Sequence, residues 1–181
     1  ERCDVIALGD NSVMARVVSA GHTAVGSPAE LARNRVAIVV AKDNPKQVEG
    51  LADFGRADLR IALGARSSSI GRHARWVLSR LPLTPKPALE ATTADDVLAA
   101  VRDGRADAGI VYATSFAGAG DAVQKIEVPE AQNTPVLYSI SSAREPTEPR
   151  GAEAFRALAL GSQGQEILLE AGFLPIGAKP H

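Results

Sequence analysis

The sequence predicts an α/β fold, in which short buried strands alternate with helices around a parallel or mixed sheet. Several apolar runs, such as 36–40 and 108–111, lack polar alternation, which is typical of strands covered on both faces. Turn and cap residues separate these runs from segments with helical spacing. With 181 residues, of which 45% are hydrophobic, the chain can bury a core as one large domain or two small lobes.

Strands are expected where short apolar runs lie between turn residues. The run 35–41 is β-branched and is broken by Asn44 and Pro45. The run 108–111 follows Gly104, which suits the left-handed end of a helix, and leads to Tyr112. The expected strands are 4–9, 35–41, 59–64, 87–91, 108–112, 123–128 and 136–141.

Helices are expected where apolar residues recur on one face after a capping residue. Asp10 or Asn11 can cap the first helix, which ends at Gly21. Pro82 ends the helix that follows the hydroxyl-rich loop 67–71. The expected helices are 11–20, 47–54, 71–81, 94–102, 153–160 and 164–171, with connectors at 22–32 and 142–150.

Composition excludes several classes of protein. The net charge is −1 and aromatic residues make up 4%, which argues against a nucleic-acid binder. Cys3 is the only cysteine, so no intramolecular disulfide or cysteine-based metal site can form within this sequence. No run has the length of a transmembrane helix, and no signal peptide is visible. The start at Glu1 is expected to be processed or truncated.

Two loops, 67–71 and 92–94, share one design, in which a strand is followed by hydroxyl residues and then by a helix. Helix N-termini present free N–H groups and a positive dipole end, which suits an anion. Tyr112 adds a phenol at the carboxyl end of its strand, where open α/β sheets bind ligands, and Gly71 is expected to let a ligand approach the backbone. Arg66 and Arg72 are candidates for additional charge. The residues expected to bind a ligand are Ser69, Ile70, Gly71, Thr93, Ala94 and Tyr112.

A simpler interpretation stays open at this point. Serine and threonine before a helix are usually N-caps, and a lone tyrosine at a strand end usually packs. Enzyme motifs are absent: His22, His73 and His181 stand in unrelated contexts, with no zinc, Walker or nucleophile-elbow pattern. His73 is expected to be a surface or partly packed helix residue. No catalytic residue, metal or cofactor is predicted.

Four segments and two residue pairs together resemble the periplasmic molybdate-binding proteins of ABC importers, in the type II solute-binding class. The most specific is 104–114, which resembles G-E-A-D-A-G-I-V-Y-x-T-D. The others are 4–14 (ADVFASAD…M), 34–45 (N-x-L-V-L-V-V-P-x-x-N-P), 69–74 (P-A-G-x-Y-A) and the pairs 154–155 and 172–173 of the C-terminal helices.

The resemblance implies a periplasmic-binding-protein-like fold of two α/β lobes with mixed sheets, holding molybdate or tungstate by neutral donors. Residues 1–40 would form part of lobe I and the first crossing strand, 41–135 lobe II, and 136–181 the second crossing strand and the helices of lobe I. Ile70 and Ala94 would each supply an N–H, and Tyr112 its hydroxyl. The chain would deliver its oxyanion to an importer permease from the periplasm or cell exterior, with a membrane anchor on the precursor as an open alternative.

Three departures from the family pattern stand out. Ser69-Ile70-Gly71 replaces Pro-Ala-Gly, so a bulkier side chain is expected at the ligand position, and Ser115 replaces the usual Asp. The family's first serine-bearing segment has no counterpart before Glu1, so lobe I is expected to be incomplete, or completed by a separate N-terminal segment, and oxyanion affinity of the chain alone weak. A ligand-sensing effector domain, a divergent member without oxyanion binding, and an enzyme on the same scaffold are the alternatives.

Overall fold

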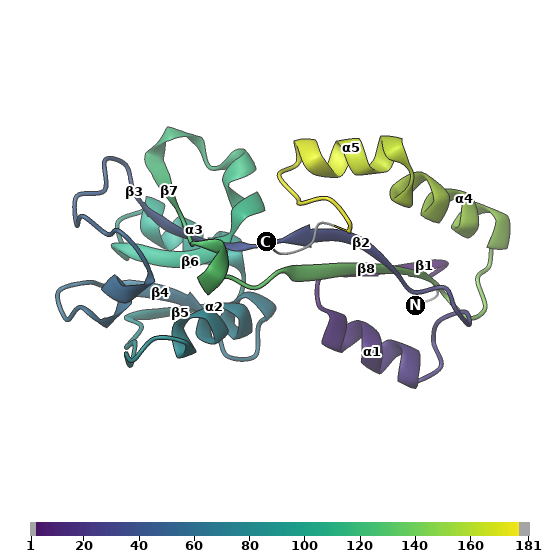
Figure 1. The fold of residues 1–181 in the computed structure, drawn as a ribbon, viewed down its shortest axis with the longest axis horizontal. Coiled ribbons are helices and arrows are strands. Elements are labelled where there is room, and N and C mark those ends of the chain that lie inside the picture. The colour runs from purple at the N-terminus through teal and green to yellow at the C-terminus, as the bar shows by residue number, and fades with distance from the viewer. Residues whose placement is uncertain (1–2, 178–181) are drawn as a thin grey trace. The chain divides into compact units, whose positions relative to one another are not determined.

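The computed structural model describes residues 3–177, which form two compact units, each with its own sheet (Figure 1). Residues 3–34 and 135–177 make up unit 1, and residues 35–134 make up unit 2. The mixed α/β architecture agrees with the predicted fold class. His181 lies outside the described residues.

Unit 1 is a three-stranded antiparallel sheet in the order β1-β8-β2. The central strand β8 comes from the C-terminal part of the chain, and its Ser142 pairs with Val5 of β1 while its Val136 pairs with Asn34 of β2. Figure 1 draws α1 and the α4–α5 pair on opposite sides of these strands. The elements are β1 (Val5–Leu8), α1 (Asn11–Ser19), β2 (Ala29–Asn34), β8 (Val136–Ser142), α4 (Pro149–Leu160) and α5 (Ser162–Glu170).

Unit 2 is a five-stranded mixed sheet in the order β5-β4-β6-β3-β7. Strands β5, β4 and β6 are parallel to one another, whereas β3 runs antiparallel to its neighbours β6 and β7. The elements are β3 (Val36–Ala41), β4 (Ile61–Gly64), α2 (Ser69–Ser79), β5 (Leu89–Ala91), α3 (Ala94–Arg102), β6 (Ala108–Tyr112) and β7 (Val123–Glu127).

A helix covers each face of the unit 2 sheet, and this explains the apolar strands. Ile38 of β3 packs in the core cluster that contains α2, whereas its neighbour Val39 packs in the cluster that contains α3. Both side chains are completely buried. The lack of polar alternation in β3 and β6 therefore reflects burial on both faces, as the sequence predicts.

The two ends of the parallel strands are held in different ways. At the amino ends of β4 and β6, the Asp107 carboxylate accepts hydrogen bonds from the Arg60 backbone N–H (2.8 Å) and pairs with the Arg60 guanidinium (2.7 Å). This hydrogen bonding to the Arg60 side chain holds the pKa of Asp107 below its ordinary value. The carboxyl ends, in contrast, lead directly into α2, α3 and a turn.

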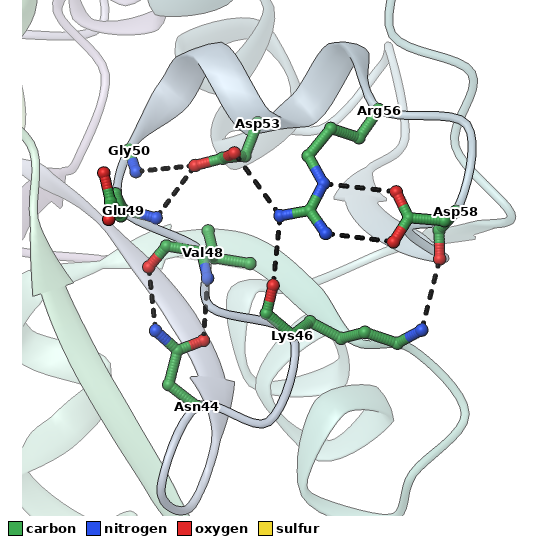
Figure 2. A network of polar contacts seen from close by, with 8 residues as sticks. All are labelled: Asn44, Lys46, Val48, Glu49, Gly50, Asp53, Arg56 and Asp58. Carbon is green, nitrogen blue, oxygen red and sulfur yellow. Dashed lines mark hydrogen bonds and ion pairs between the residues drawn. The ribbon is translucent and has the colours of Figure 1, made fainter.

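The predicted helix over 47–54 is wrong, because only a short 3-10 turn, Leu51–Gly55, forms there. Figure 2 shows the reason: side chains bind the backbone groups that a helix would use. The Asn44 amide bonds both the N–H and the carbonyl of Val48 (2.9 and 2.8 Å), and Asp53 accepts from the N–H of Gly50 (3.1 Å). Gln47 has a positive φ of 51°, which also breaks helical geometry.

Two further differences concern unit 1. Strand β2 lies partly within the predicted connector 22–32; its run Ala-Glu-Leu-Ala-Arg-Asn has no β-branched residue and is a strand because it pairs with β8. Helix α4 begins at Pro149, earlier than the predicted residue 153, since proline is well tolerated in the first helical turn.

The division between the units falls at residues 34/35 and 134/135. Strand β3, which we expected to share the crossing segment of lobe I, belongs to unit 2 because it lies between β6 and β7. The Asn133 side chain holds this end of unit 2, donating to the Val36 carbonyl (2.8 Å) and accepting from the Val36 N–H (3.3 Å).

Candidate functional site

The predicted ligand-binding residues all lie in unit 2, at the carboxyl ends of three neighbouring parallel strands. Strand β4 leads into α2, β5 leads into α3, and β6 ends at Tyr112. Because β5, β4 and β6 are parallel and adjacent, their carboxyl ends share one edge of the sheet. The Ala65 N–H donates to the Ala91 carbonyl (2.7 Å), which ties the two loops together.

Helix α2 presents the more favourable anion site. Ser68 is its N-cap, and its hydroxyl accepts from the Gly71 N–H (3.1 Å) and donates to the Ala65 carbonyl (2.8 Å). The N–H groups of Ser69 and Ile70 have no hydrogen-bond partner within residues 3–177. No acidic residue stands in the first turn of α2, so its positive dipole end is not neutralised there.

The Ile70 side chain does not occupy the site. It is 2% exposed and packs in the core cluster of unit 2 beneath α2. Only the backbone of Ile70 is therefore offered to a ligand, and the expected obstruction by a bulkier side chain does not arise.

Gly71 is required for packing inside unit 2. A Cβ atom at this position would lie 2.5 Å from the Gly64 carbonyl oxygen and closer still to that of Ala65. The absence of a side chain thus lets α2 lie directly against the end of β4. Its N–H is already bonded to the Ser68 cap, so a ligand contact by Gly71 remains a prediction.

Helix α3 begins with a capping box. The Thr93 hydroxyl accepts from the Asp96 N–H (3.1 Å), and the Asp96 carboxylate accepts from the Thr93 hydroxyl (2.7 Å) and N–H (3.2 Å). Thr93 therefore acts as an N-cap, which is the simpler of the two interpretations of a threonine before a helix. The Ala94 N–H has no partner among the residues described, yet Asp95 and Asp96 place negative charge in the same turn. This charge weakens the attraction of α3 for an anion.

Tyr112 connects the end of β6 to α2. Its hydroxyl donates to the Ser69 hydroxyl (3.1 Å) and lies 3.3 Å from Nδ1 of His73. The same Nδ1 atom lies 2.9 Å from the Ser69 carbonyl oxygen, and the two rings meet edge to face. The half-buried Tyr112 is thus held beside the free N–H groups of α2.

His73 and Arg75 are the residues that the sequence interpretation missed. The signal for His73 is its spacing of four residues from Ser69, which places both on one face of α2. Arg75 bonds the Gly64 carbonyl (2.5 Å) and the Gly71 carbonyl (3.1 Å) and pairs with Glu90, so it supports the loop. The candidate cation Arg72 donates to the Ser67 carbonyl (2.9 Å).

The arrangement supplies neutral hydrogen-bond donors: backbone N–H groups, the Ser69 hydroxyl and the Tyr112 phenol. Within residues 3–177, no three metal-binding side chains of His, Cys, Asp or Glu come together. None of the described helices combines the length and the apolar character needed to cross a lipid bilayer.

The sequence matches one protein family along nearly its whole length. A family model described as "Bacterial extracellular solute-binding protein" matches residues 1–174. The molybdate-binding protein ModA of Mycobacterium tuberculosis is 32% identical over 177 residues, which are 98% of this chain and 66% of that protein. The chain therefore spans slightly less than two thirds of the length of this curated relative.

Solved structures share the fold. A substrate-binding domain from Clostridium difficile, assigned to a molybdenum ABC transporter, superposes with a TM-score of 0.78 at 26% identity, covering 96% of this chain and 77% of that one. The periplasmic molybdate-binding protein of Azotobacter vinelandii gives a TM-score of 0.77 at 20% identity, covering 94% and 78%.

Proposed function

Since the chain belongs to the bacterial extracellular solute-binding protein family, we propose that it binds a tetrahedral oxyanion, molybdate or tungstate, as the solute-binding component of an ABC importer. One observation carries this proposal: two helix N-termini and the Tyr112 hydroxyl meet at the carboxyl edge of β5, β4 and β6. The names of the relatives supply the ligand class.

The chemistry of the donors suits an oxyanion. A tetrahedral dianion has several oxygens that accept hydrogen bonds, and backbone N–H groups at a helix N-terminus are oriented to donate to them. On this proposal the N–H groups of Ser69 and Ile70 form the main contact, Tyr112 donates its phenolic hydrogen, and Ala94 contributes from the less favourable α3. Discrimination of molybdate and tungstate from the smaller sulfate would depend on the size of the space between these donors.

The proposal includes the setting of the protein. The family is extracellular, and the chain would meet its permease at the membrane from the periplasm or cell surface, with a membrane anchor in a longer precursor as one arrangement. An oxyanion would be its ligand, without a resident cofactor and without catalysis.

The proposal includes a further partner for unit 1, a separate N-terminal segment that would complete lobe I, because the match covers 66% of the relative's length. Among the described strands, β1 has only β8 as a neighbour, so its other edge can accept a strand. A hollow of about 850 Å³ beside it is lined by apolar side chains such as Ile6, Leu8 and Val17 and by the charged residues Arg144 and Glu145. Backbone amide exchange tests this: pairing with the N-terminal third of ModA should slow exchange in β1, and unchanged exchange contradicts it.

The oxyanion proposal is tested by amide NMR. Titration of the chain with molybdate, tungstate and sulfate, against sodium chloride of equal ionic strength, should shift the N–H resonances of Ser69, Ile70 and Ala94. NMR suits this chain because it detects weak binding. Shifts that are absent, or that chloride reproduces, would leave the chain as a divergent member without oxyanion binding.

A further inference from the structure

We propose that His73 is the positioning residue of the oxyanion site, and that its protonation makes oxyanion binding stronger at lower pH. This inference rests on the proposed function and extends it. It depends on the contacts that the imidazole makes with Ser69 and Tyr112.

The contacts identify the hydrogen on Nδ1. A carbonyl oxygen can only accept a hydrogen bond, and the Ser69 carbonyl oxygen lies 2.9 Å from Nδ1 of His73. If Nδ1 carried no hydrogen, two acceptors would face each other at this distance and repel. We therefore assign the hydrogen to Nδ1, which makes this atom a donor in both the neutral and the charged ring.

This assignment sets the direction of the Tyr112 hydroxyl. Because Nδ1 is a donor, the Tyr112 oxygen, 3.3 Å away, cannot give its hydrogen to His73. The phenolic hydrogen is left for the Ser69 hydroxyl at 3.1 Å, or for an oxyanion that takes its place. His73 thereby keeps Tyr112 a donor toward the free N–H groups of α2.

Protonation adds charge to the same arrangement. With Nδ1 already protonated, the remaining site is Nε2, and a proton there makes the ring an imidazolium. A positive charge one side chain away from the ligand favours a dianion, so affinity should rise as the pH falls through the pKa of His73 in the complex.

Several charged groups on the neighbouring elements have partners of their own, whereas Asp95 adds negative charge in the first turn of α3. On α2, Arg72 donates to the Ser67 carbonyl and Arg75 pairs with Glu90. At the start of α3, the Asp96 carboxylate is bonded by Thr93. From β6, the titratable side chain of Tyr112 contacts the ring.

Two variants separate the donor from the charge. His73→Asn keeps an N–H donor near the position of Nδ1 but cannot titrate, whereas His73→Leu removes both properties. The assay is NMR titration with molybdate at about pH 8 and about pH 6. Sulfate, whose charge is constant over this range, controls for protonation of the ligand. His22, an exposed residue of unit 1, supplies a matched control variant, His22→Asn.

We expect the affinity of the wild-type chain and of His22→Asn to rise about tenfold between these pH values. His73→Asn should bind equally at both, near the wild-type value at pH 8, and His73→Leu should bind more weakly at both. In the wild type, molybdate should raise the pKa of the His73 ring, which checks the inference without any variant.

The inference is overturned if wild-type affinity does not depend on pH, or if His73→Asn keeps the dependence. The failure of the proposed function looks different, since the wild-type chain would then bind neither anion at either pH.

Discussion

Replacing Tyr112 with phenylalanine tests the phenolic oxygen, the atom that connects β6 to Ser69 and His73 of α2. The substitution removes the phenolic oxygen and leaves the ring, so packing at the end of β6 is retained. In the free protein this oxygen donates to Ser69 and lies beside His73. On the proposed function, the same hydrogen turns to the oxyanion when it binds.

The expected loss of affinity follows from this exchange of partners. A hydrogen bond to a charged group contributes about 1.5–3 kcal/mol, and a bond between neutral groups about 0.5–1.5 kcal/mol. Because the bond to the Ser69 hydroxyl is given up on binding, the net loss should be about 1–2 kcal/mol. This corresponds to a dissociation constant about five to thirty times larger.

The assay is titration of molybdate into the wild type and Tyr112→Phe, with amide shifts of α2 as the signal. The chain has two tyrosines, so Tyr138→Phe in unit 1 is a matched control that removes a phenolic oxygen outside the site. Tyr138 lies largely buried, and burial raises the pKa of its phenol. If Tyr112→Phe binds as tightly as the wild type, Tyr112 does not contact the ligand and the reasoning fails.

Three other predictions concern unit 2. Gly71→Ala should lower the free energy of unfolding by about 1–3 kcal/mol in urea denaturation, because the new Cβ meets the carbonyls of residues 64 and 65; Gly118→Ala, with open space around it, should change little, and equal effects would contradict the packing argument. Asp96→Asn should strengthen molybdate binding severalfold by removing a negative charge from the first turn of α3, and weaker binding would show that its carboxylate does not oppose the ligand. The stability difference between the wild type and Asp107→Asn should be constant at neutral pH and vanish as acid protonates the carboxylate. The folded pKa of Asp107 is lowered, so its contribution to the free energy of unfolding is present above the unfolded pKa, near 4, and is lost as the pH falls through the folded value. A difference that persists below both values, in denaturation followed against pH, would assign the effect to something other than the charge.

The strands of the unit 2 sheet and helices α2 and α3 were predictable because local sequence and burial agree there, whereas the segment 47–54 was not. The run 36–41 is β-branched and covered on both faces, and Gly104 has the positive φ of 70° that its position after α3 suggests. Site residues could be chosen for the same reason, since hydroxyl residues follow strands that turn out to be parallel neighbours.

Other features depend on contacts that no local pattern encodes. Strand β2 forms because β8, about a hundred residues later, pairs with it. The spacing of four residues puts His73 on the same face of α2 as Ser69, but its contact with Tyr112 could not be predicted, because the position of that strand beside α2 is a property of the fold. The role of Gly71 likewise depends on where two carbonyl oxygens lie.

The position of β8 in the middle of the unit 1 sheet also determines when each unit can fold during synthesis. Among the described residues, unit 2 is one continuous segment, 35–134, so all of its strands and helices have been synthesised once residue 134 has left the ribosome. In unit 1, neither β1 nor β2 has its ladder partner until residues 136–142 emerge. To fold, unit 1 must therefore close a loop that contains the whole of unit 2. This makes unit 1 the slower-folding and more aggregation-prone part of a nascent chain.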